Sequence, residues 1–427
     1  MEHKRIKAED GINLTVITDK RYKTTVTSVS FIAGEGERAA ACSALLTGVL
    51  SRSCRKYPSL IEINRALDDL YDAQLNADSR HYGLSQVPVF KISSLNNRYS
   101  LDKTDITGGC LDILYSIIAE PCLVSGAFDE KVFESEKQQL ISAVNSIINN
   151  RSNYALFRCT DELMAYEPRF SQRFGSLKTI RELTPADVLD FYYDVIKNAP
   201  VNIVFVSSED DPRIYEFAEK TAGKLGKRGD GVVTEAEFRQ PGKRMKRKIE
   251  KMPITQDVLC VGCALDGDYR DGLGAERALY GEIFSQNPTS RLFENVREKL
   301  SLCYYCSSIP LLDLKKMIIY AGVDGKNRKK AEAEILKQTE LMKNGVSADE
   351  LERCRLSLKN DILSLCDSPS RTAAWYASRD LHGLELYSPY EFSASLDQVT
   401  PDGVVRVAKG ITPYFTYVLE GDSDVEN

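Results

Sequence analysis

The sequence predicts an α+β protein of two homologous domains, each a mostly antiparallel sheet with helices packed on one face. Strand patterns are followed by long amphipathic helices in both halves, and several residues recur at one constant offset. The 427 residues are also too many for a single ordinary core. With 43% apolar and 28% charged residues, the composition is that of a globular protein.

Strand and helix signals follow the same order in each half. The first half opens with two stretches rich in β-branched residues, 13–19 and 24–34, which suit paired strands. The second half opens in the same way at residues 256–265. Apolar residues at one-face helical spacing follow at 40–57, and an amphipathic helix is expected at 129–148 with a counterpart in the second half.

A constant offset of 216 residues relates the two halves. It matches Glu134 with Glu350, Glu136 with Glu352, Lys137 with Arg353, and Leu140 with Leu356. The same offset relates Thr184-Pro185 to Thr400-Pro401, and both pairs fit a helix start with Thr as the cap. A shared offset across separate elements predicts an internal duplication.

The predicted domains span residues 1–220 and 246–427, with a linker at 221–245. The linker begins TAGKLGKRGDGVV, which is rich in Gly and charge and poor in large apolar residues. The basic run KRMKRKIEK at 243–251 is interpreted as its solvated end.

Composition also excludes several function classes. No run of about 18 apolar residues exists, and charges stand where a signal peptide needs an apolar stretch. The odd number of cysteines, eleven, fits reduced thiols, so we expect a cytoplasmic protein without a membrane segment. A net charge of −6 argues against nucleic acid as the main partner.

The most informative segment, residues 290–308, reads SRLFENVREKLSLCYYCSS and places Arg297 and Tyr304 seven residues apart. Arg297 offers fixed donors that suit peptide carbonyls or a carboxylate. Tyr304 offers a hydroxyl that can donate to a carbonyl oxygen as it becomes an oxyanion. On spacing alone, an Arg paired with a nearby glutamate and a core Tyr are the alternative interpretation.

The whole segment resembles the substrate-binding segment of the insulinase, pitrilysin and mitochondrial processing peptidase family, whose usual string is close to SRLFxEVREKxGLAYSVSS. Two differences stand out: Ser301 replaces Gly, and Tyr305 replaces Ser. Residues 346–373 are similar to the same family. The resemblance implies the LuxS/mitochondrial processing peptidase-like metallohydrolase fold. It also implies that Arg297 and Tyr304 bind an extended peptide substrate.

The zinc site of that family is missing from the sequence. The family carries H-x-x-E-H on a helix close to VAHFLEHMLFKGTKKYP, where this chain reads ACSALLTGVLSRSCRKYP. Ala44, Thr47 and Gly48 stand at the three site positions, and Ser142 or Ala143 replaces the distal glutamate. The chain has three histidines, none of them in this helix, so the helix cannot hold a zinc ion of the family type.

Two cysteine pairs offer an alternative metal site, Cys260-x-x-Cys263 and Cys303-x-x-Cys306. Both pairs stand in apolar or aromatic runs that are typical of strands. Residues three apart on a strand face opposite sides, so we expect small buried hydrophobic side chains instead of ligands.

The resemblance therefore implies a non-catalytic subunit of a two-component zinc peptidase. Such a chain binds no cofactor itself and forms a heterodimer with a zinc-bearing homologous subunit. It is also similar to a zinc-less bacterial family member that is associated with 5-aminopentanol modification of elongation factor P. Two alternatives stay open: a peptide- or protein-binding scaffold without proteolysis, and a stand-alone metallopeptidase with atypical ligands.

Overall fold

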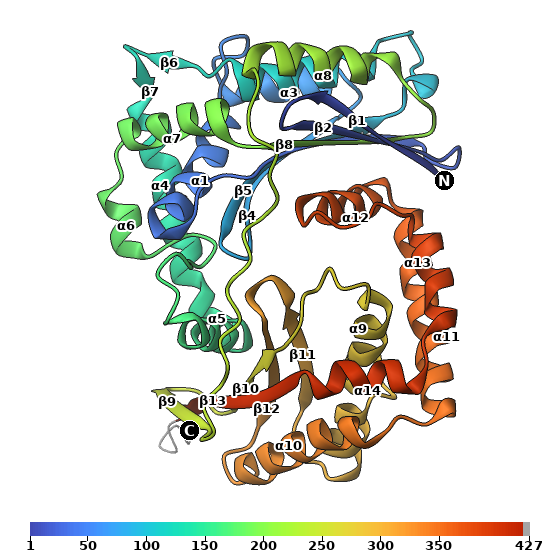
Figure 1. The fold of residues 1–427 in the computed structure, drawn as a ribbon. Coiled ribbons are helices and arrows are strands. Elements are labelled where there is room, and N and C mark those ends of the chain that lie inside the picture. Colours follow the sequence, from blue (N-terminus) through green and yellow to red (C-terminus); the bar gives the residue numbers. More distant parts are fainter. Residues whose placement is uncertain (422–427) are drawn as a thin grey trace. The chain divides into compact units, whose positions relative to one another are not determined.

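The computed structural model describes residues 1–421, which form two compact units (Figure 1). Unit 1 comprises Met1–Val144, Arg169–Thr234 and Ser364–Pro389. Unit 2 comprises Asn145–Pro168, Glu235–Leu363 and the chain from Tyr390. Each unit is therefore assembled from three separate stretches of sequence.

The main sheet of unit 1 has six strands in the order β1-β2-β8-β3-β5-β4. Neighbouring strands are antiparallel except β2 and β8, which run parallel. The strands are β1 (Glu2–Glu9), β2 (Ile12–Thr18), β3 (Thr24–Phe31), β4 (Gln74–Tyr82), β5 (Ser85–Leu95) and β8 (Val201–Ser207), and a small separate pair is formed by β6 (Leu123–Val124) and β7 (Ala127–Phe128).

Helices cover both faces of this sheet. One face carries the main apolar core of the unit, which α1 and α3 close with side chains such as Leu45 and Ile113. The other face is closed by α12, whose Ala373 and Tyr376 pack with Val26 of β3. The helices of unit 1 are α1 (Gly36–Leu50), α2 (Leu60–Asp68), α3 (Ile106–Ala119), α4 (Glu130–Ser146), α6 (Leu177–Glu182), α7 (Pro185–Asn198), α8 (Pro212–Leu225) and α12 (Pro369–Leu381).

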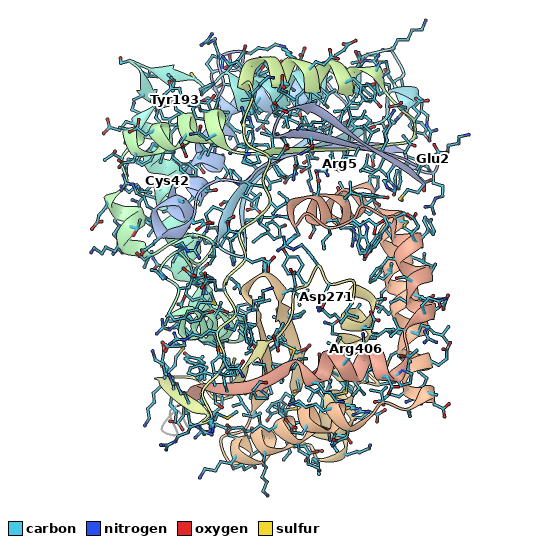
Figure 2. All side chains as sticks on the ribbon, viewed as in Figure 1. Glu2, Arg5, Cys42, Tyr193, Asp271 and Arg406 are labelled. Atoms are coloured by element: carbon cyan, nitrogen blue, oxygen red, sulfur yellow. The ribbon has the colours of Figure 1, made fainter. Side chains whose placement is uncertain are left out.

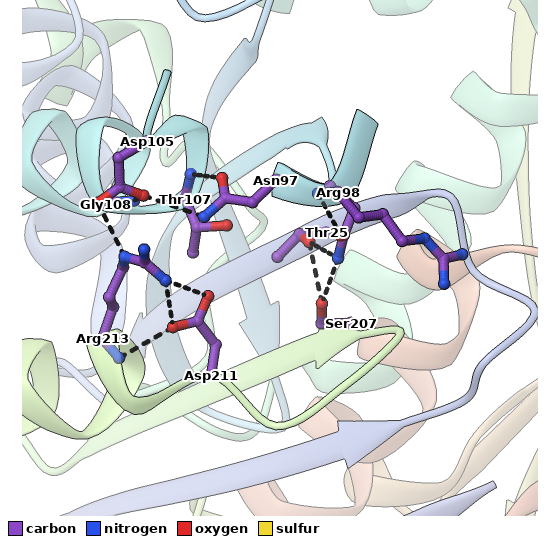
Figure 3. A network of polar contacts seen from close by, with 10 residues as sticks. Thr25, Asn97, Arg98, Asp105, Thr107, Gly108, Ser207, Asp211 and Arg213 are labelled. Carbon is purple, nitrogen blue, oxygen red and sulfur yellow. Dashed lines mark hydrogen bonds and ion pairs between the residues drawn. The ribbon is translucent and has the colours of Figure 1, made fainter. Parts of the chain in front are cut away.

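Polar contacts fix the helix starts and strand ends of unit 1. Asp105 caps α3 by accepting from the Gly108 N–H, and its other oxygen accepts from Arg213 at the start of α8 (Figure 3). Asn97 joins this network by accepting from the Thr107 N–H. On the face that α12 covers, Arg5 of β1, labelled in Figure 2, forms an ion pair with a buried aspartate of α12.

The sheet of unit 2 has five strands in the order β11-β12-β10-β13-β9. Only β9 and β13 run parallel. The elements are β9 (Lys246–Met252), β10 (Asp257–Leu265), β11 (Tyr305–Leu311), β12 (Lys316–Val323) and β13 (Ile411–Gly421), with α5 (Arg151–Met164), α9 (Gly274–Gly281), α10 (Arg328–Asn344), α11 (Ala348–Ser364), α13 (Pro389–Ser395) and α14 (Pro401–Lys409). The interpretation of the basic run as a linker end is wrong, because most of it forms β9.

The two sheets share one topology. Read from the parallel pair outward, β2-β8-β3-β5-β4 corresponds to β9-β13-β10-β12-β11, with the same relative strand directions. The helices α4 and α11 have equal lengths of 17 residues and begin 218 residues apart. Thr184 and Thr400 cap α7 and α14, as the offset predicts. The predicted α+β class is confirmed, whereas helices cover both faces of the unit 1 sheet and not one face as predicted.

Each half of the sequence also contributes one helix to the other unit. From the first half, α5 packs on β10, β12 and β13 in unit 2. From the second half, α12 packs on β3 and β8 in unit 1. Within residues 1–421, no helix is long and apolar enough to cross a membrane.

Candidate functional site

Arg297 lies in the π-helical segment Phe293–Lys299 of unit 2, with 43% of its side chain exposed. Its guanidinium lies 4.7 Å from the centre of the Phe293 ring, which holds the side chain by a cation–π contact. The carboxylate of Glu298 is 3.5 Å away and is itself exposed. An exposed pair of this kind is weak, so the guanidinium donors stay accessible to a ligand.

Tyr304 lies directly before β11 and is 59% exposed. Its backbone N–H donates to the carbonyl of Gly322, which fixes the residue against β12. Its hydroxyl donates to Asp324 Oδ1 over 2.9 Å. This hydrogen bond to a carboxylate raises the pKa of Tyr304, so the hydroxyl stays protonated and can act as a donor.

Ser301 and Tyr305, which differ from the residues usual in the family, have separate structural consequences. Ser301 adopts a left-handed backbone conformation with φ of 49°, which explains why glycine is usual at this position. Tyr305 is partly buried, and its hydroxyl contacts the Ser152 hydroxyl on α5. Its ring covers Gly322, where a Cβ would lie 2.3 Å from Tyr305 Cε1. Tyr305 is therefore a packing residue, whereas the exposed neighbour Tyr304 carries the accessible hydroxyl.

The expectation for the second cysteine pair holds for Cys306, which is buried in β11, and is wrong for Cys303. The strand begins at Tyr305, so Cys303 precedes it, and the thiols of Cys303 and Cys306 form a hydrogen bond. That bond, together with the positive charge of Arg297, lowers the pKa of the partly exposed Cys303. The first pair matches the expectation, because Cys260 and Cys263 lie within β10 and are fully buried.

In unit 1, α1 carries Ala44, Thr47 and Gly48, the positions that the sequence resemblance aligns with the family's zinc motif. The Thr47 hydroxyl is buried and donates to the Ala44 carbonyl over 2.9 Å, so it serves its own helix. Gly48 is covered by Glu136 of α4: a Cβ at Gly48 would lie 2.7 Å from Glu136 Oε2. The carboxylate of α4 therefore rests on the backbone of α1.

An ion pair occupies this position. The Arg52 Nε donates to Glu136 Oε1 over 2.6 Å, and the Glu136 side chain is only 12% exposed. Ala143 is exposed on α4, seven residues beyond Glu136, and it has no donor atom in its side chain. A divalent cation needs lone pairs from imidazole or carboxylate groups, and here the one carboxylate already binds a cationic guanidinium. These residues do not fit a zinc ion.

The three histidines stand on different elements of unit 1. His3 of β1 shares a hydrogen bond with the Tyr376 hydroxyl, 3.2 Å from its Nδ1. His81 of β4 contacts the Phe170 ring, and His382 donates from Nδ1 to the Ser378 carbonyl. Across the described part of the chain, no three His, Cys, Asp or Glu side chains are grouped so as to hold a metal ion.

The outer edge of the unit 1 sheet runs beside α1. β4 is the last strand of its sheet and pairs only with β5 among residues 1–421. The Ser79 hydroxyl on β4 and the Ser43 hydroxyl on α1 are 2.7 Å apart and buried, and the Ser79 carbonyl accepts from Arg173 Nε over 2.6 Å. The edge strand therefore contacts α1, and one of its carbonyls is bonded by an arginine side chain. Neither the Arg52–Glu136 pair nor this edge follows from a sequence pattern, because both depend on contacts between distant segments.

The chain is similar in sequence to known proteins. A family model described as the peptidase M16 inactive domain matches residues 182–358. The chain is 23% identical over 413 residues to a probable inactive metalloprotease, YmfF, of Bacillus subtilis strain 168, with 96% of each chain covered.

Solved structures show the same fold. A conserved protein from Enterococcus faecalis V583 is 22% identical and has a TM-score of 0.89, with both chains covered completely. A peptidase M16 inactive domain from Pseudomonas fluorescens is 15% identical, with a TM-score of 0.81 and complete coverage of both chains. A protease from Helicobacter pylori gives 14% identity and a TM-score of 0.80, with 98% of this chain and 99% of that chain covered.

Proposed function

We propose that this chain is a non-catalytic member of the M16 peptidase family and acts as the substrate-binding subunit of a two-component zinc peptidase, a proposal that the family match and the inactive relative support. The observation that supports this proposal is a contrast between two sites. An arginine–glutamate pair fills the altered zinc position in unit 1. In unit 2, the guanidinium of Arg297 and the hydroxyl of Tyr304 are exposed and can bind a substrate, but neither residue can hydrolyse a peptide bond by itself.

In this proposal, Arg297 and Tyr304 act on a peptide whose scissile bond lies at the zinc of a homologous partner subunit. The guanidinium of Arg297 donates to peptide carbonyls and fixes the direction of the chain. The hydroxyl of Tyr304 leaves Asp324 and donates to the carbonyl oxygen that becomes negative during attack. Asp324 keeps the hydroxyl oriented until the substrate replaces it. The zinc activates the attacking water and belongs to the partner.

Unit 1 by itself offers a surface that can satisfy the backbone groups of an extended peptide. β4 is the last strand of its sheet, and a peptide that adds there, in place of the Arg173 side chain that bonds the Ser79 carbonyl, becomes a seventh strand of the unit 1 sheet. This mode explains why such a subunit keeps the peptidase fold after the zinc site is lost.

Reconstitution tests the proposal. The full chain is mixed with an M16 homologue that carries H-x-x-E-H, and peptide hydrolysis is followed for each protein alone and for the mixture. We expect a complex on size-exclusion chromatography and hydrolysis only in the mixture. We expect Tyr304→Phe to lower kcat in the mixture by about 100-fold, the usual effect of removing one oxyanion donor. A binding scaffold without proteolysis would instead form the complex and leave the peptide intact.

The link to elongation factor P modification, which the resemblance implies, stays a prediction. It is checked by the intact mass of elongation factor P from cells that lack this chain. A mass shift equal to the loss of the 5-aminopentanol group supports the link, and an unchanged mass removes it.

A further inference from the structure

A polar cavity of about 310 Å³ lies within unit 1, between the sheet and α12. Its floor consists of side chains from β3, β4 and β5, and its roof is α12. The roof side chains are small, which leaves the space open. The polar lining comprises Ser28, Ser30, Asn76, Asp78, Arg80, Tyr82, Lys91 and Ser370, and the roof adds Ala373, Ala374 and Ala377.

The charges around this cavity are not balanced. Asp78 is the one acidic side chain of the lining, and it already contacts two cations, Arg80 at 3.6 Å and Arg173. The guanidinium of Arg80 also bonds the Tyr82 hydroxyl. Lys91 is partly buried, and within residues 1–421 its ammonium forms no ion pair or side-chain hydrogen bond. A partly exposed ammonium without a protein acceptor is available to pair with an anionic group of a ligand.

Lys91 lies one strand away from the outer edge of the sheet, which is formed by β4. Lys91 of β5 is paired in register with Asn76 of β4, and both line the cavity. A peptide strand added at β4 would lie about 10 Å from β5, two interstrand spacings away. That gap is within the combined reach of a lysine and a glutamate side chain. Alternate side chains of the added strand point to this same face of the sheet.

We infer that the cavity under α12 receives an acidic side chain of the extended peptide, and that Lys91 is its main partner with Arg80 beside it. The inference rests on the proposed peptide binding at β4 and adds the substrate class: a segment with Asp or Glu at one fixed position. The carboxylate would give Lys91 the charged acceptor that the folded chain lacks.

The test uses the immobilised full-length chain and a pool of random decapeptides. Retained peptides are sequenced by mass spectrometry and compared with the input pool at each position. We expect about tenfold enrichment of Asp and Glu at a single position, the effect of one charge-assisted hydrogen bond. Lys91→Gln should abolish this enrichment and still retain peptides. The matched control, Lys131→Gln on the exposed face of α4, should keep it.

The outcomes separate this inference from the proposed function. Retained peptides without acidic enrichment would overturn the acidic subsite and leave peptide binding intact. Enrichment that persists in Lys91→Gln would also overturn the role of Lys91. Retention no greater than that of a blank resin would overturn peptide binding at β4, and the subsite with it. Circular dichroism of each variant confirms that the fold is unchanged.

Discussion

The two units share one sheet topology but differ in the polar side chains beside the sheet, which are buried in unit 1 and exposed in unit 2. In unit 1, the Arg52–Glu136 ion pair lies against α1. The Glu136 side chain packs on the backbone of Gly48, which has no Cβ. In unit 2, the segment before β11 leaves Arg297 and Tyr304 exposed. The comparison shows that the same sheet topology supports a buried ion pair beside one sheet and exposed polar side chains beside the other.

The exchanged helices give the largest expected effect. Tyr376 of α12 is fully buried on the sheet of unit 1, so Tyr376→Ala should cost about 3–5 kcal/mol. Hydrogen exchange should lose protection in β3 and β8. The matched variant Leu163→Ala on α5 should instead lower protection in β10 of unit 2. Loss of protection in the opposite unit, for either variant, would contradict the exchange of helices.

The next largest effect is expected at Lys316, a lysine buried in unit 2. Lys316 of β12 is 1% exposed, and burial lowers the pKa of its ammonium from 10.5 to about 8. Between these values the unfolded chain holds the proton that the folded chain has lost, so stability rises with pH across this window. Lys316→Met should therefore stabilise the protein by about 1–3 kcal/mol at pH 7.

The gain in stability from Lys316→Met should shrink toward pH 10, because the Lys316 amine of the folded wild-type protein is already neutral there. Urea unfolding of both proteins at pH 7 and pH 10 measures it. The hydrogen bond from Lys316 Nζ to the Tyr166 hydroxyl, 3.3 Å long, is lost at both pH values, so it does not produce the difference. An equal gain at the two pH values would argue against a buried charge.

An effect of similar size is expected where Glu136 covers α1. Gly48→Ala places a methyl group 2.7 Å from Glu136 Oε2 and should destabilise the protein by about 1–3 kcal/mol. Shortening the glutamate removes the clash, so Gly48→Ala should cost less in a Glu136→Ala background. Thermal unfolding of the double-mutant cycle measures this coupling. Additive effects would show that α4 does not rest on Gly48.

The smallest effect is expected at Ser301, in the segment that carries Arg297 and Tyr304. Ser301→Gly should stabilise the protein by roughly 0.5–1 kcal/mol, because glycine adopts the left-handed conformation without a Cβ clash. Ser301→Ala keeps the Cβ and should give no gain. Denaturant midpoints of the three proteins decide the matter, and equal gains from both variants would contradict the backbone explanation.

Local signals predicted the local features of the fold. The caps at Thr184 and Thr400 follow from Thr-Pro pairs, because a threonine hydroxyl accepts from the N–H groups of the first turn. Ser347 likewise accepts from the Glu350 N–H at the start of α11, while the Glu350 carboxylate accepts from Arg291.

Contacts between distant segments explain what sequence patterns missed. The strand β9 is highly charged, and only its parallel pairing with β13 makes it a strand. The exchange of α5 and α12 leaves no periodicity in the sequence. Arg297 and Tyr304 were selected from one continuous string, but the contact of Tyr304 with Asp324 depends on β12 ending beside it. The predicted domain limits stay a prediction.

The central proposal is that this chain binds the substrate while a partner subunit supplies the zinc. The peptidase rate of a one-to-one mixture with a zinc-bearing homologue tests it most directly. Arg297→Ala in this chain should lower kcat/KM by about 100-fold or more, whereas Lys299→Ala, in the same π-helical segment, should leave it nearly unchanged. Equal rates for wild type and Arg297→Ala, or chelator-sensitive hydrolysis by this chain alone, would contradict it.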